Sequence, residues 1–117
     1  MEHRLSKRVE GELPILVYKR GMPVATGKIQ DASKRGLFVA TEFTNVRINQ
    51  TIQLSFRLPD HRQGHQTLTA HVARRSDDGL GLDFDGVDND AHVIAELLIW
   101  LDNHASEAAI TGRHRIH

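Results

Sequence analysis

The chain has 117 residues, of which 39% are hydrophobic and 26% are charged, and this length and composition fit one globular domain with a single core. It contains no cysteine, which excludes disulfides, thiolate zinc sites and cysteine nucleophiles. Its formal net charge at pH 7 is zero, so binding to nucleic acid through bulk electrostatic attraction is not expected.

The first part of the sequence predicts an arm followed by a β-hairpin. Residues 1–10 are polar and lack hydrophobic periodicity, which predicts a flexible arm. Residues 13–20 and 24–31 have β-like patterns, and the turn-forming residues 21–23 separate them. We therefore expect these two segments to pair as a hairpin.

Four further strands are expected, at residues 37–40, 52–58, 68–72 and 80–84. The segment 52–58 alternates strictly between apolar and polar side chains, which indicates a strand with one buried face. Gly36 is typical of a corner that needs either a positive φ or a close approach of two backbones. Residues 77–79 form a glycine-containing hairpin turn before the last strand.

The hydrophobic period becomes helical after Asp90. Apolar residues between Val93 and Leu101 recur at a spacing that places them on one face of a helix. Asp88, Asn89 or Asp90 is expected to cap the N-terminus of this helix.

Six short strands followed by one helix predict a mostly β fold, a small six-stranded antiparallel β-barrel with a C-terminal α-helix. Trp100 borders the apolar face of the helix and is expected to pack on an opening of the barrel. We expect one domain over residues 1–105, with residues 1–10 as its arm, and a frayed tail over residues 106–117.

Two short motifs carry the chemistry of the sequence. The motif Arg4-x-x-x-Arg8 offers two planar guanidinium groups, whose N–H donors match phosphate oxygens or the O6/N7 edge of guanine. The motif Asp31-x-Ser33-x-x-Gly36 places a carboxylate and a hydroxyl two residues apart, on one face of a strand. Its carboxylate can accept hydrogen bonds from the N1–H and N2–H₂ groups of guanine. Together the motifs indicate a site for a guanine nucleotide.

These motifs, in this order, resemble those of the PilZ domain, the bacterial receptor for the second messenger cyclic di-GMP. The segment from Gly79 to Phe84 is similar to the late glycine-containing strand of that family, and the resemblance covers nearly the whole chain. It implies a split barrel that binds cyclic di-GMP between the arm and the barrel surface.

The resemblance also implies roles for individual residues. Arg4 and Arg8 would bind guanine Hoogsteen edges and phosphate oxygens, and Asp31 would bind the N1–H/N2–H₂ side of a guanine. Ser33 would add a hydroxyl contact, and Gly36 would hold the corner that presents both side chains.

Further basic residues are candidates for additional ligand contacts. Lys7 lies inside the first motif and Arg35 inside the second, where solvated surface charge is the competing interpretation. Arg74 or Arg75, late in the fifth strand, could place a guanidinium over the face of a guanine.

No metal site or catalytic apparatus is predicted. The acidic run from Asp83 to Asp90 lacks the ligand and glycine spacing of a calcium loop. His61 and His65 fall in a loop without an evident third ligand. The sequence contains no nucleophile elbow, Walker loop or dinucleotide fingerprint, so we expect neither an enzyme nor a bound cofactor.

Three functions are compatible with such a barrel. The first is a receptor and adaptor that binds cyclic di-GMP, orders its arm and thereby changes its contacts with a protein partner that the sequence does not identify. The second is an interaction module with the same fold and no nucleotide ligand. The third, single-stranded nucleic-acid binding, is disfavoured because only 5% of residues are aromatic. No membrane span or signal peptide is predicted, so we expect no membrane association and a cytoplasmic location.

Overall fold

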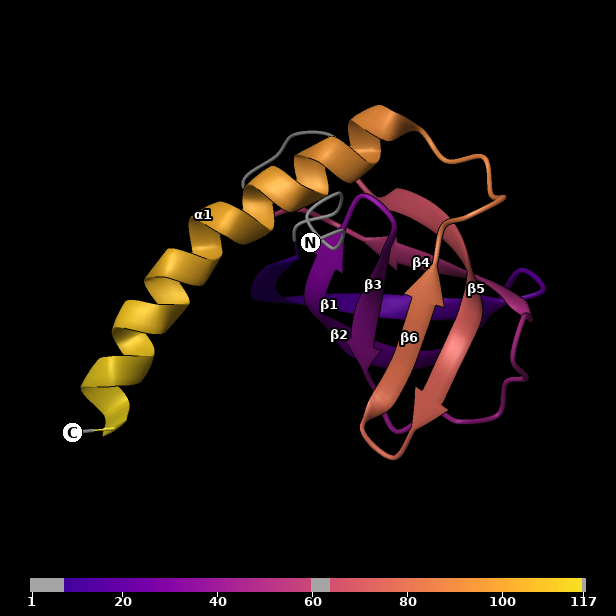
Figure 1. Cartoon of the computed structure of the whole chain (residues 1–117), viewed down its shortest axis with the longest axis horizontal. Helices are drawn as coiled ribbons and strands as arrows, with labels where there is room; N and C mark the ends of the chain where they lie inside the picture. Colours follow the sequence, from indigo (N-terminus) through magenta and orange to yellow (C-terminus); the bar gives the residue numbers. More distant parts are fainter. Residues whose placement is uncertain (1–7, 60–63, 117) are drawn as a thin grey trace, which may run out of the picture.

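A computed structural model of the chain describes residues 8–59 and 64–116, with side chains as far as His104 in the final helix. Within these residues six strands form a closed antiparallel barrel in the order β1-β2-β3-β6-β5-β4, and one helix follows them (Figure 1). The elements are β1 (Val9–Lys19), β2 (Met22–Ser33), β3 (Gly36–Ala40), β4 (Thr51–Phe56), β5 (Gln66–Ser76), β6 (Gly79–Asp83) and α1 (Ala91–Ile116). The predicted fold class is confirmed.

The first hairpin is longer than the sequence pattern predicts. β1 begins at Val9, which pairs with Ala32 of β2, so residues 9 and 10 belong to the barrel and not to the arm. The connecting turn consists of Arg20 and Gly21, with φ angles of 55° and 79°, and not of residues 21–23. Two consecutive left-handed residues are typical of the tight turn that joins twisted antiparallel strands, and this places the next residue, Met22, in β2.

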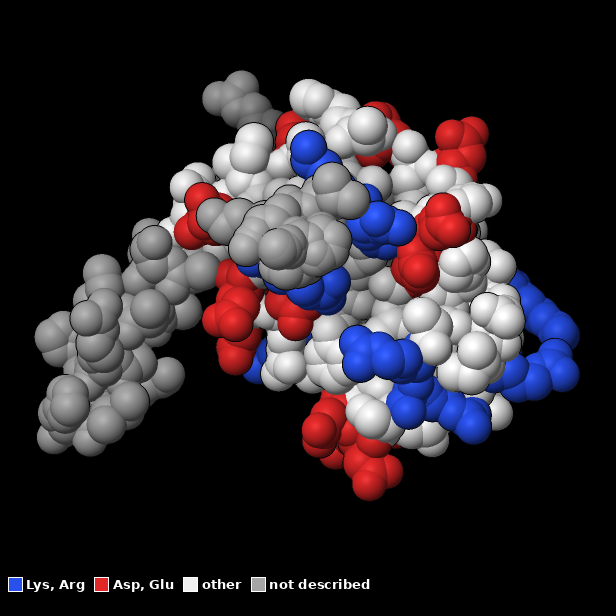
Figure 2. Space-filling view, in the orientation of Figure 1, with Lys and Arg blue, Asp and Glu red and all other residues white. Residues whose placement is uncertain are grey.

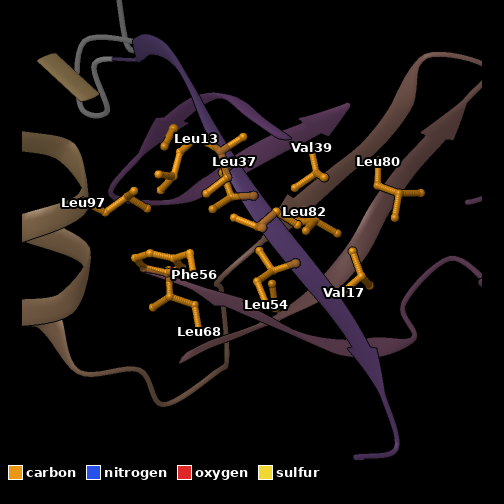
Figure 3. Packing of buried hydrophobic residues seen from close by; sticks show 14 of the residues in the cluster. Leu13, Val17, Leu37, Val39, Leu54, Phe56, Leu68, Leu80, Leu82 and Leu97 are labelled. Atoms are coloured by element: carbon orange, nitrogen blue, oxygen red, sulfur yellow. The ribbon is translucent and has the colours of Figure 1, made fainter. Parts of the chain in front are cut away.

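The barrel is filled by the alternating apolar side chains that the sequence predicts. Ile52, Leu54 and Phe56 of β4 are at most 2% exposed. Leu97 of α1 points toward the core residues Leu13 and Phe56 (Figure 3), and so closes the barrel at the end where β1 begins.

The helix is held to the barrel at its start and along its first turns. Asp90 is the N-cap, because its Oδ1 accepts a hydrogen bond of 2.9 Å from the N–H of His92. Asn89 instead bonds the backbone of Thr69, accepting from its N–H at 2.9 Å and donating to its carbonyl at 2.8 Å. Trp100 is buried, as expected, and its ring stacks on that of His104.

Close packing of α1 on β1 depends on a glycine. A β-carbon built at Gly11 would lie 2.9 Å from Cδ2 of Leu101, which is fully buried, so the missing side chain lets the helix approach the strand. The helix continues to Ile116. Three alanines between residues 105 and 109 favour this continuation, since alanine has the highest helix propensity. Within the described residues, α1 has no apolar stretch long enough to cross a membrane.

Candidate functional site

The second motif forms the tight connection between β2 and β3. Ser33 ends β2 and pairs with Gly36, the first residue of β3. Ser33 is 1% exposed, and its hydroxyl accepts a hydrogen bond from the N–H of Arg35 at 3.1 Å and donates to the carbonyl of Gly36 at 3.5 Å. The Arg35 carbonyl in turn accepts a bond of 2.9 Å from the N–H of Phe84. The serine therefore fixes the turn, which is tied to the end of β6.

Gly36 is required by a close backbone approach and not by a positive φ. A β-carbon at this position would lie 2.1 Å from the carbonyl oxygen of Leu82 and 3.2 Å from Cα of Asp83. Gly36 pairs with Asp83 across β3 and β6, so neither backbone can move without breaking the pairing. Of the two reasons that the sequence left open for this glycine, the structure supports close approach.

Arg8 and Asp31, one residue from each motif, form an ion pair. The Nε and Nη2 groups of Arg8 both donate to Oδ1 of Asp31, the first at 2.7 Å. The pairing of Val9 with Ala32 at the start of β1 brings the two side chains together. They are partly exposed, Arg8 by 48% and Asp31 by 29%. Arg4 and Lys7 lie outside the described residues.

An open hollow of about 270 Å³ lies beside this ion pair. It is lined by Arg8, Ser33, Arg35, Gly36, Leu37, Ala73, Arg74, Gly81, Leu82 and Asp83. Arg8 of the first motif and Ser33 and Gly36 of the second therefore meet at one concavity, formed by the β2–β3 turn and the adjoining parts of β5 and β6. On the face drawn in Figure 2, the visible basic side chains form separate groups, and acidic side chains lie among them.

Of the two arginines late in β5, Arg74 faces the hollow. It pairs with Gly81 of β6, and a β-carbon at Gly81 would lie 3.1 Å from both Nε and Nη2 of Arg74. The guanidinium thus rests on the bare backbone of Gly81. Arg75 is engaged elsewhere, because its Nη1 donates to the carbonyl of Val46 at 2.5 Å.

Asp83 is a residue of the hollow that the motifs did not identify. Its position opposite Gly36 is the structural reason for its presence there. One oxygen of its carboxylate accepts a hydrogen bond of 2.8 Å from the N–H of Asp85. In the sequence, Asp83 is marked only by its place at the end of the last strand. That place does not predict a position at the hollow unless the order of the strands in the barrel is known.

Among the described side chains, those of residues 8–59 and 64–104, no group of three or more metal-ligating residues comes together. Within the acidic run, Asp83 bonds the backbone of Asp85 and Asp90 caps α1. His61, of the pair considered as metal ligands, lies outside the described residues.

Comparison with known proteins identifies a family. The family model described as PilZ domain matches residues 2–100 of the chain, a segment that includes all six strands, both motifs and the first part of α1. A search of curated proteins gives no match.

Proposed function

Since the chain belongs to the PilZ domain family, a family of cyclic di-GMP receptors, we propose that it binds cyclic di-GMP at the hollow beside Arg8 and Asp31. The observation that carries the proposal is the meeting of both motifs at this one concavity. The binding residues are Arg4, Arg8, Asp31, Ser33 and Gly36, with additional contacts from Lys7, Arg35 and Arg74.

The ligand has the chemistry that these groups require. Cyclic di-GMP carries two guanines and two phosphates, with a charge near −2. The carboxylate of Asp31 accepts hydrogen bonds from the N1–H/N2–H₂ side of a guanine, and the arginines donate to Hoogsteen edges and phosphate oxygens. Ser33 and Gly36 fix the turn at which these groups meet.

The receptor acts through binding and carries no catalytic activity. Ligand binding orders the N-terminal arm over the hollow, and the rearranged surface changes contacts with a protein partner. Arg8 directly precedes β1, and β1 packs against α1 at Gly11, so an event at the site reaches a second surface through one strand. The proposed location is the bacterial cytoplasm.

Calorimetric titration of the full chain with cyclic di-GMP tests the proposal. We expect saturable binding, amide chemical-shift changes at residue 8 and at 31–36, and weaker affinity at higher salt because screening reduces the phosphate contacts. Cyclic di-AMP is the matched control and is expected to bind much more weakly. Absence of both heat and shift changes with cyclic di-GMP would leave the interaction module without a nucleotide ligand as the function.

Substitution of Arg74 by alanine is expected to weaken cyclic di-GMP binding by about 0.5–1 kcal/mol, the range for an exposed cation–π contact. The reason is that its guanidinium rests on Gly81 at the hollow, where a guanine face can stack on it. Arg75→Ala is the control, because the neighbouring arginine bonds the Val46 carbonyl instead. Titration of both variants under one buffer condition measures the difference, and equal affinities would remove Arg74 from the site.

A further inference from the structure

The proposed guanine acceptor, Asp31, already has a hydrogen-bonding partner within the chain. Oδ1 of Asp31 accepts hydrogen bonds from two N–H groups of Arg8, Nε and Nη2, which are joined through one carbon. Guanine presents the same fragment, since its N1–H and N2–H₂ donors are joined through C2. Arg8 therefore occupies Asp31 in the manner of the ligand's own base edge.

We infer that Arg8 is an internal competitor for Asp31 and that cyclic di-GMP binds by exchange. A guanine edge replaces Arg8 on the carboxylate, and the released guanidinium moves to the ligand. This inference rests on the proposed function and adds a specificity-determining role, that of Arg8 in the free protein. A base can displace Arg8 only if it offers paired N–H donors, which guanine has and adenine lacks.

The positions of the two side chains allow such an exchange. Both are partly exposed, whereas Ser33 and the backbone around Gly36 are buried and fixed, so Arg8 can leave Asp31 without disturbing the barrel. Arg8 also lies outside β1, just before its first residue, Val9.

The exchange leaves both Asp31 and Arg8 with hydrogen-bonding partners. Asp31 gives up a cation and receives two neutral donors, while Arg8 gives up a carboxylate and requires another anion. A phosphate of the same ligand molecule supplies that anion. Guanosine alone would leave Arg8 without an anion, and phosphate alone would leave Asp31 without donors. The site therefore favours a ligand that carries both groups.

A double-mutant cycle on binding tests the exchange, using the native chain, Arg8→Ala, Asp31→Asn and the double variant. If Arg8 must leave Asp31 before it binds the ligand, its contribution to affinity is reduced in the native chain and restored when Asp31 no longer holds it. The loss of affinity caused by Arg8→Ala is then expected to be greater in the Asp31→Asn chain than in the native chain. The difference should be about two- to fivefold, the range for a partly exposed ion pair. Amide spectra verify that each variant is folded.

An equal or smaller loss in the Asp31→Asn chain would overturn the exchange, because it would mean that the two side chains act independently or stay paired in the complex. Failure of the native chain to bind cyclic di-GMP at all would instead overturn the proposed function. A second measurement uses the native protein alone. In the free native protein, the Nε–H resonance of Arg8 should be protected from exchange with solvent. This protection should be lost in Asp31→Asn, and the resonance should shift on addition of cyclic di-GMP. An unprotected resonance in the free native chain would also overturn the inference.

Discussion

Substitution of Arg8 by alanine is expected to weaken cyclic di-GMP binding by about 1–3 kcal/mol, or roughly 5- to 150-fold in Kd, the range for losing a bidentate contact to guanine. Arg8 lines the hollow and is the member of the arginine motif that the structure describes beside Asp31. Calorimetry at one fixed salt concentration measures the change. Arg4→Ala is expected to cause a loss of the same order on the grounds of the motif alone.

The matched control for this experiment is Arg47→Ala. Arg47 is exposed in the loop between β3 and β4, a loop that bonds Lys19 at the end of β1 through the carbonyl of Asn45. It therefore lies near the opposite end of the strand that Arg8 precedes. Affinity is expected to be unchanged in the control, and a native affinity in Arg8→Ala would contradict the role assigned to this arginine.

Substitution of Gly36 by alanine is expected to lower the free energy of unfolding by about 3 kcal/mol, at the upper end of the usual cost of overpacking. The added methyl group would lie 2.1 Å from a carbonyl oxygen, and that oxygen belongs to the backbone of the paired strand β6. The strain can be relieved only by separating β3 from β6 at the hollow. Denaturation in urea, analysed by linear extrapolation, measures the loss.

Gly64→Ala is the control for the glycine experiment. A β-carbon at Gly64 meets no heavy atom of the described residues within 4 Å, and the φ of Gly64 does not lie in the left-handed region. The free energy of unfolding of Gly64→Ala is expected to remain within about 0.5 kcal/mol of the native value. Similar losses in both variants would show that the cost comes from the flexibility of glycine and not from contact with Leu82.

The strands were predictable where one face is buried and the other is exposed. Ile52, Leu54 and Phe56 alternate with polar residues, and the structure buries all three. The ends of strands were less predictable, because Val9 and Met22 are held by pairing with a neighbour and not by an apolar pattern of their own. The adjacency of β3 and β6 joins segments distant in sequence and had no local signal.

The motifs of the site were predictable, but the state of their side chains was not. The spacing of Asp31, Ser33 and Gly36 was enough to predict that they lie close together where β2 meets β3. The sequence pattern does not reveal that Arg8 forms an ion pair with Asp31. The alternation of side chains along a strand could not predict which of Arg74 and Arg75 faces the hollow, for a different reason. A register shift between Val72 and Arg74 breaks the period of two just before these residues.

The pairing of Val9 with Ala32 has a thermodynamic consequence for recognition. The backbone of the residue that follows Arg8 is already fixed in the sheet, so ligand binding at Arg8 restricts mainly its side-chain torsions. That restriction costs at most about 2 kcal/mol of conformational entropy at 25 °C, and less for an arginine that is already held by Asp31 before the ligand arrives. The entropic penalty at this contact is therefore largely met during folding.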